Sequence, residues 1–214
     1  MSDDAQRVGE RSGPRFEFRS FGQDFDAIRL RLGLLSAPVP EHLRERRSDE
    51  TYIVSRTNDV NNTKVRDGRM DIKTLLRTVG GLEQWEPLMK AAFPLSESAL
   101  RDEVFAAFRV QVPALPVGDC DYGTFMTLVR AHPDLAAVDV RKHRFAYQVH
   151  GTVCEYAVVL VNGARMVTVS TESTDVEAIG RAIADTGMAG LENVNYLKAI
   201  KRVIGMLPTP LVHA

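Results

Sequence analysis

Basic side chains occur in pairs two residues apart at several places in this chain. Lys64 precedes Arg66 and Lys142 precedes Arg144, while Asp71 stands in the same relation to Lys73. In a β-strand, residues two apart point to the same face, so each pair would place two charged groups side by side. Ammonium and guanidinium groups are the donors that bind phosphate oxygens. The pairs therefore suggest an anion site, provided that their strands meet around a common space.

The segment PRFEFRSF (14–21) alternates in the same way but carries both signs of charge. Its charged face consists of Arg15, Glu17 and Arg19, and its phenylalanines lie on the other face. The late segment MVTVSTES (166–173) also alternates, and its polar face ends in Glu172. Carboxylates on neighbouring strands could hold a hard cation or take part in acid–base chemistry.

Two arrangements would produce these charged faces. A sheet that packs its apolar face on helices and leaves its charged face in water gives the same pattern. A sheet that closes on itself would gather the charges in one lumen, where like charges repel unless an anion lies between them. The pairing of basic residues on adjacent segments favours the closed sheet, with a polyphosphate as its ligand.

The elements that must position these residues are clearest in the last third of the chain. We expect three consecutive strands over 137–149, 152–161 and 165–173, joined by His-Gly and Asn-Gly-Ala turns, and then two helices. Earlier strands are expected over 50–55 and in a hairpin formed by 63–67 and 69–76. About seven or eight strands with helices at intervals indicate one α+β domain around an antiparallel sheet.

Three segments are harder to interpret. The prolines and charges of 36–50 predict a connecting loop, in which RERR (44–47) is solvated charge rather than a nucleic-acid patch. The segment 80–96 is interpreted as a loop with a short helix. The segment 98–112 fits either a helix or a strand from about Val104, and in the strand alternative Arg109 would join the basic face.

Bulk properties limit the possible partners. The 214 residues carry 27 basic and 28 acidic side chains, a net charge of −1, so no overall field favours nucleic acid or a membrane surface. The first 13 residues have no signal-peptide pattern and are expected to be disordered, with 14–214 forming a single domain. Cys120 and Cys154 lack metal-type spacing and suggest a reducing, cytoplasmic location. We expect a small phosphorylated ligand as partner, and the oligomeric state stays open, with a homodimer as one option.

The order and parity of these motifs resemble the CYTH domain of the triphosphate tunnel metalloenzyme superfamily. The resemblance runs from about residue 14 to 205, includes the final NVNYLKAIKRVIG (193–205), and suggests a divergent bacterial-type member. It implies an eight-stranded antiparallel tunnel with surrounding helices, in which Mg²⁺ or Mn²⁺ assists triphosphate hydrolysis. By position, Glu17 and Glu172 would be catalytic, and the metal ligands would be Glu17, Glu155 and Glu172. The implied phosphate-binding residues are Arg15, Arg19, Lys64, Arg66, Lys73, Arg109, Lys142 and Arg144.

The chain departs from the family signature at two positions. The opening pattern of the family is Glu-x-Glu-x-Lys, and here Arg15 takes the place of the first acid. The late strand of the family usually carries two acids, and here Ser170 takes the place of one. Losing two oxygen ligands weakens a site for a hard cation. Three functions therefore stay open: a metal-dependent triphosphatase, a phosphate-binding module without turnover, and a class IV-type adenylyl cyclase.

Overall fold

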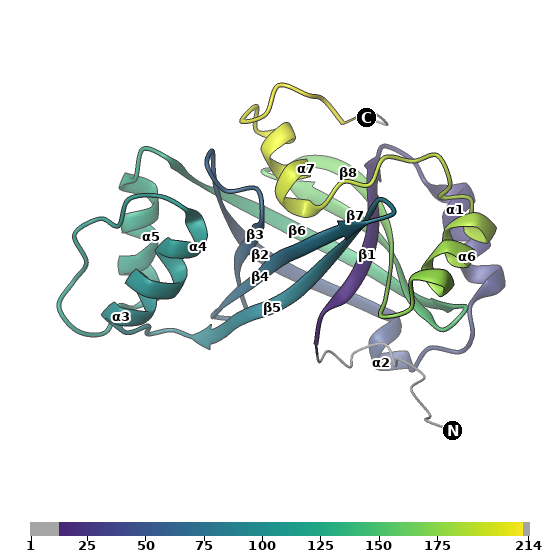
Figure 1. Ribbon diagram of the computed structural model, residues 1–214, viewed down its shortest axis with the longest axis horizontal. Coiled ribbons are helices and arrows are strands. Elements are labelled where there is room, and N and C mark those ends of the chain that lie inside the picture. The colour runs from purple at the N-terminus through teal and green to yellow at the C-terminus, as the bar shows by residue number, and fades with distance from the viewer. Residues whose placement is uncertain (1–12, 212–214) are drawn as a thin grey trace.

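Eight antiparallel strands form a closed barrel in the computed structural model, which describes residues 13–211 (Figure 1). Around the barrel the order is β1-β5-β4-β3-β2-β6-β7-β8, and β1 closes it by pairing with both β5 and β8. The strands are β1 (Arg15–Gly22), β2 (Glu45–Ser55), β3 (Asn61–Arg66), β4 (Arg69–Val79), β5 (Leu82–Ala92), β6 (Leu135–Val149), β7 (Thr152–Val161) and β8 (Ala164–Ser173). The predicted α+β fold around an eight-stranded barrel is confirmed.

The predicted meander of the last third is present as β6, β7 and β8. Its second turn, Asn162-Gly163, has positive φ at both residues, 46° and 89°. Such angles define the tight turns whose twist matches that of the flanking strands, and they favour asparagine and glycine. The predicted hairpin of β3 and β4 is also present.

Helices lie around the barrel in separate groups (Figure 1). One end carries α3, α4 and α5, the opposite end carries α1 and α6, and α7 lies across the strands between them. The helices are α1 (Asp26–Leu35), α2 (Glu41–Arg44), α3 (Glu97–Ala99), the π-helical turn η1 (Leu100–Phe105), α4 (Ala106–Phe108), α5 (Tyr122–Ala131), α6 (Val176–Thr186) and α7 (Tyr196–Val203). Within residues 13–211, no helix is long and apolar enough to cross a bilayer.

The apolar faces of the strands point outward and are covered by these helices. On one side the outward residues pack on η1, α4 and α5, in a cluster that includes Ile53, Val65, Ile72, Leu100, Phe105 and Phe125. Around β1 they pack on α1 and α6, in a cluster that includes Phe16, Phe18, Leu32 and Ile179. Since successive side chains alternate between faces, the charged faces point into the barrel. The alternative of a charged face in water is therefore wrong.

One half of the lumen is apolar and is closed by α7. Inward residues of the strands and residues of α7 form one cluster, which includes Phe21, Tyr52, Val140, Val159, Leu197 and Ile200. The start of α7 is fixed by Asn195, whose side-chain oxygen accepts a hydrogen bond from the backbone N–H of Lys198 at 2.9 Å. The Asn195 amide also donates to both carboxylate oxygens of buried Glu83, at 3.0 and 2.9 Å. The charged residues occupy the other half.

Two predicted loops are strands instead. The segment 36–50 contains α2 and the first half of β2. In this half of β2, Glu45, Arg46 and Arg47 are exposed. Because charged residues occur on both faces of the strand, the alternation of polar and apolar residues was not visible in the sequence. The segment 80–96 contains β5, in which Pro87 lies beside an irregularity in the pairing with β4. Proline cannot donate to the sheet and is tolerated at such irregularities.

The open alternative at 98–112 is resolved as helix. Leu100–Phe105 and Ala106–Phe108 are helical, and Arg109 ends the helix with a left-handed backbone, φ 56° and ψ 42°. The strand that would have carried Arg109 into the lumen is absent from this segment. The disorder predicted for residues 1–13 falls almost wholly outside the described residues, and the single domain over 14–214 stays a prediction.

Candidate functional site

The polar half of the lumen gathers nearly all of the residues that the sequence singled out. Lining side chains come from strands on every side of the barrel and from the start of α7. Among them are nine predicted site residues, Glu17, Arg19, Lys64, Arg66, Lys73, Lys142, Arg144, Glu155 and Glu172. The cavity lining has six basic and four acidic side chains. Most of the basic ones lie on β3 and β6, and most of the acidic ones lie on β1, β7 and β8.

The basic wall consists of Lys64 and Arg66 on β3 and Lys142 and Arg144 on β6. Beneath it lies Glu50 of β2, whose carboxylate is fully buried. Its oxygens lie 3.0 Å from Lys64 Nζ, 2.8 Å from Lys142 Nζ and 3.5 Å from Arg66 Nη1. One carboxylate therefore holds three cations in place, with Asp71 of β4 as a second partner of Arg66 at 3.4 Å.

The pKa values on this wall reflect burial and crowding of like charges. Burial, opposed in part by Glu50, lowers the pKa of Lys64 to about 8. Burial and the nearby Lys64 ammonium lower the pKa of Lys142 well below its usual range. Burial acts to raise the pKa of Glu50, but Lys142 and Lys64 outweigh it and hold that pKa far below normal. An anion in the lumen would relieve the repulsion between the two lysines.

Arg144 differs from the other three residues of the basic wall because no acid pairs with it among residues 13–211. It is only 9% exposed, and its buried Nε has no hydrogen-bond partner in that range. A buried guanidinium stays charged and is costly without a counter-charge. Arg144 is therefore able to donate hydrogen bonds to an anion in the lumen.

Two tyrosines complete the floor of the cavity. Tyr52 accepts a hydrogen bond from Lys142 Nζ at 2.7 Å, and the Tyr196 ring centroid lies 3.6 Å from the same nitrogen. The rings of Tyr52 and Tyr196 stack with centroids 5.7 Å apart. The Tyr196 hydroxyl is buried without a hydrogen-bond partner in the described range, and burial raises its pKa well above normal. It is therefore a neutral donor facing the lumen.

The acid wall consists of Glu17 on β1, Glu155 on β7 and Glu172 on β8. Glu17 and Glu172 are directly opposite each other across the β1–β8 pairing. Each carboxylate faces an arginine of β1: Arg19 Nε donates to Glu17 at 2.6 Å, Arg19 Nη1 lies 3.3 Å from Glu155, and Arg15 Nη1 lies 3.6 Å from Glu172. Every carboxylate of this wall is therefore paired with a guanidinium group, and two arginines serve the three acids.

The acid wall does not fit the expected Mg²⁺ or Mn²⁺. Mg²⁺ binds oxygen ligands in a nearly regular octahedron, yet here a guanidinium bridges two of the three candidate carboxylates. Among residues 13–211, no group of three or more His, Cys, Asp or Glu is arranged to hold a metal ion. Burial acts to raise the pKa of Glu17, but Arg19 and Lys73 outweigh it and lower that pKa. Glu17 is thus an ion-pairing carboxylate and not a proton donor near neutral pH.

Three of the predicted phosphate contacts need correction or refinement. Arg109 was placed in the lumen by the strand alternative, but it is exposed at the end of α4, and its carbonyl accepts a hydrogen bond from Thr57. Arg19 lies in the lumen but is committed to Glu17 and Glu155. Arg15 contacts Glu172 at the edge of the same wall.

Sequence reasoning missed at least four residues of the site, namely Glu50, Tyr52, Tyr196 and Arg46. Glu50 was assigned only to the start of a strand, although its spacing of two from Tyr52 places both on the inner face. Tyr196 was visible only as part of the closing helix. Arg46, counted as solvated charge, lies at the mouth in a second cavity that shares Arg19, Arg144, Glu155 and Glu172 with the first. The mouth is partly apolar, lined by Leu43, Ala146, Val153 and Cys154.

Comparison with solved structures identifies the fold. HpAC1 from Hippeastrum, a candidate adenylyl cyclase described as having a dominant triphosphatase activity, is 13% identical, with a TM-score of 0.50 over 95% of this chain and all of its own. A candidate adenylate cyclase from Bacillus halodurans is 10% identical over 87% of this chain and 97% of its own, with a TM-score of 0.47. The PH1012 protein from Pyrococcus horikoshii is 14% identical over 86% and 97%, with a TM-score of 0.47.

No family model matches the chain, and no curated protein matches it by sequence. The comparison with HpAC1 nevertheless agrees with the closed barrel. The chain shares its fold, a closed eight-stranded antiparallel barrel with surrounding helices, with HpAC1.

Proposed function

We propose that the lumen binds a triphosphate-class anion, either inorganic tripolyphosphate or an organic triphosphate. The observation that carries this proposal is the basic wall, where three cations share the Glu50 carboxylate and buried Arg144 has no acidic partner among residues 13–211. An anion that accepts hydrogen bonds from Arg144 would supply the missing charge. Several cations within one cavity match a ligand with several phosphoryl groups.

The mouth of the lumen supports an organic triphosphate as well as the inorganic one. Its apolar side chains, Leu43, Ala146 and Val153, lie beside Arg46 and Arg144. A small organic group could contact the apolar residues while its phosphates reach the basic wall. Protein sites for small molecules commonly combine apolar lining with a few placed polar groups.

Hydrolysis is the second candidate. HpAC1, which shares this fold, is described as a triphosphatase, and Glu17 and Glu172 face the same lumen as the basic residues. The mismatch of the acid wall to a divalent metal favours binding without turnover over metal-dependent hydrolysis. Use of Mg²⁺ or Mn²⁺ and a catalytic role for these acids stay predictions.

The test is thermal unfolding of the purified protein with tripolyphosphate, ATP, pyrophosphate and orthophosphate, at low and high salt. Because a ligand that binds only the folded state stabilises it, tripolyphosphate should raise the Tm most and orthophosphate least. Salt should reduce the effect, since screening weakens ionic contacts. Absence of a shift with every anion would contradict the proposal. Phosphate release measured on the same samples distinguishes a hydrolase from a binding module.

A further inference from the structure

The acid wall already contains the positive charge that a metal would bring. Arg19 lies between two carboxylates, 2.6 Å from Glu17 and 3.3 Å from Glu155, and Arg15 faces the third, Glu172, at 3.6 Å. These side chains are largely shielded from water, with 10% of Arg19 and 12% of Arg15 exposed. Salt screens such partly buried ion pairs much less than exposed ones.

A divalent cation could not bind here without displacing a guanidinium. Arginine does not lose its proton in proteins, so a displaced Arg19 would stay charged. Its guanidinium also lies 4.7 Å from the Tyr196 ring and donates to Thr168 Oγ1 at 3.3 Å. Moving it would sacrifice these contacts and leave a buried charge without a partner.

We propose that Arg15 and Arg19 take the place of the divalent cation, so that the lumen binds its polyphosphate ligand without any metal. This inference rests on the proposed function. In it, the acid wall holds two arginines in fixed positions opposite the basic wall. Arg19, through its ion pairs with Glu17 and Glu155, is a positioning residue for the acid wall.

The first test is calorimetric titration of the unmodified protein with tripolyphosphate in chelator and in Mg²⁺, with free tripolyphosphate corrected for its Mg²⁺ complex. We expect binding in chelator, with a Kd that Mg²⁺ changes by less than about threefold, well under 1 kcal/mol. Binding only with metal would overturn the inference and leave the proposed function intact. Absence of binding under both conditions would overturn both.

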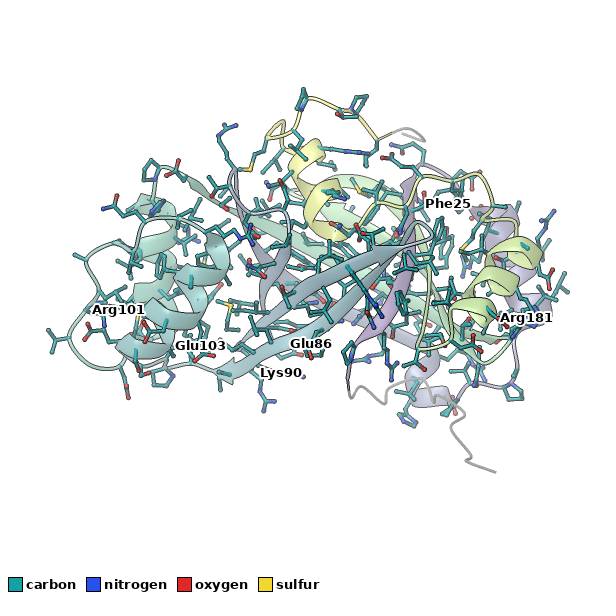
Figure 2. All side chains as sticks on the ribbon, viewed as in Figure 1. Phe25, Glu86, Lys90, Arg101, Glu103 and Arg181 are labelled. Carbon is teal, nitrogen blue, oxygen red and sulfur yellow. The ribbon has the colours of Figure 1, made fainter. Side chains whose placement is uncertain are left out.

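The second test measures Mn²⁺ directly by electron paramagnetic resonance without any phosphate. The unmodified protein should leave Mn²⁺ free, and a stoichiometric Mn²⁺ site in it would overturn the inference. The double variant Arg15→Glu with Ser170→Glu should gain Mn²⁺ binding, because Ser170 lies opposite both Arg19 and Glu155 in the sheet. Arg181→Glu, on the outer helix α6, is a control that makes the same arginine-to-glutamate change away from the lumen and should gain none (Figure 2). A double variant that folds and binds no Mn²⁺ would contradict the role given to Arg15.

Discussion

The basic wall and the acid wall face the same lumen but differ in how their charges are matched. On the acid wall, every carboxylate contacts an arginine of β1. On the basic wall, three cations share Glu50, and Arg144 has no acidic partner within residues 13–211. Every acid of the first wall therefore has an ion-pair partner, whereas one cation of the second wall has none among the described residues.

This difference distinguishes charges that are paired within the fold from charges that a ligand could contact in the polar half of the lumen. Matched buried pairs keep the barrel interior charged without requiring a ligand, although their own contribution to stability is small or unfavourable. An excess of cations raises the free energy of the empty protein and is relieved when an anion binds. The basic wall is therefore where a phosphorylated ligand should have its largest effect.

The largest expected effect follows from removing the buried carboxylate of the basic wall. Glu50→Gln leaves Lys64, Arg66 and Lys142 without their shared acid, and breaking such buried pairs costs about 3–5 kcal/mol. We expect chemical denaturation to show that loss in the free energy of unfolding, and tripolyphosphate to restore part of it. Glu45→Gln, at an exposed position of the same strand, is the control and should change stability little. A Glu50→Gln protein as stable as the original would contradict the account.

Removing Arg144, unlike removing Glu50, should not lower the free energy of unfolding of the empty protein. Arg144→Gln deletes a buried charge that no acid matches, so the empty protein should become no less stable. Loss of charged hydrogen bonds worth about 1.5–3 kcal/mol should weaken tripolyphosphate binding by about 10- to 100-fold in calorimetric titration. Arg109→Gln, outside the lumen, should leave the affinity unchanged. Equal effects of the two variants would mean that the ligand does not contact the basic wall.

Neutralising an acid of the acid wall should not weaken tripolyphosphate binding, in contrast to the loss expected for Arg144→Gln. Glu17→Gln removes a negative charge from the lumen while Arg19 keeps Glu155 as a partner. Tripolyphosphate affinity should therefore stay the same or increase by a few-fold. Such a gain is on the order of 1 kcal/mol, as expected for removing one negative charge that faces the same lumen as the ligand. Glu103→Gln, exposed on η1 among the helices at one end (Figure 2), provides the control. A large loss of affinity in Glu17→Gln would place ligand binding on the acid wall.

The smallest effect concerns pH. With its pKa near 8, Lys64 loses its proton as pH rises through that value, and its attraction for phosphate is then lost. Affinity for tripolyphosphate should fall from pH 7 to pH 9 relative to Lys64→Arg, which stays charged. The pKa in the folded state lies below the ordinary lysine value of 10.5, so this lysine makes the empty protein more stable as pH rises from about 8 to about 10.5. Parallel pH profiles of the two proteins would exclude this role for Lys64.

The barrel itself was predictable from strands with strict alternation. In β1, β3 and β8 one face is charged or polar and the other apolar, and the Asn162-Gly163 turn fixes the register between β7 and β8. β5 escaped prediction because it contains Pro87 and follows two glycines. The first half of β2 escaped because its charges fall on both faces, and the strand signal there depends on pairing with β6.

The charged residues of the lumen were predictable to the extent that parity determines which face they occupy. Parity could not reveal which charges pair, since the contact of Arg19 with Glu155 joins residues 136 positions apart. It also could not separate Arg109 from the lumen, because a short apolar segment fits helix and strand equally well. Glu50 was missed because its role depends on three partners from two other strands.

The most direct test of the account is a crystal structure of the protein with tripolyphosphate. The account predicts phosphate oxygens within hydrogen-bond distance of Arg144 and Arg66, opposite an acid wall whose contacts between Arg19, Glu17 and Glu155 are preserved. Phosphate bound on the outer surface, or a metal ion between Glu17 and Glu172 that holds the ligand, would contradict it.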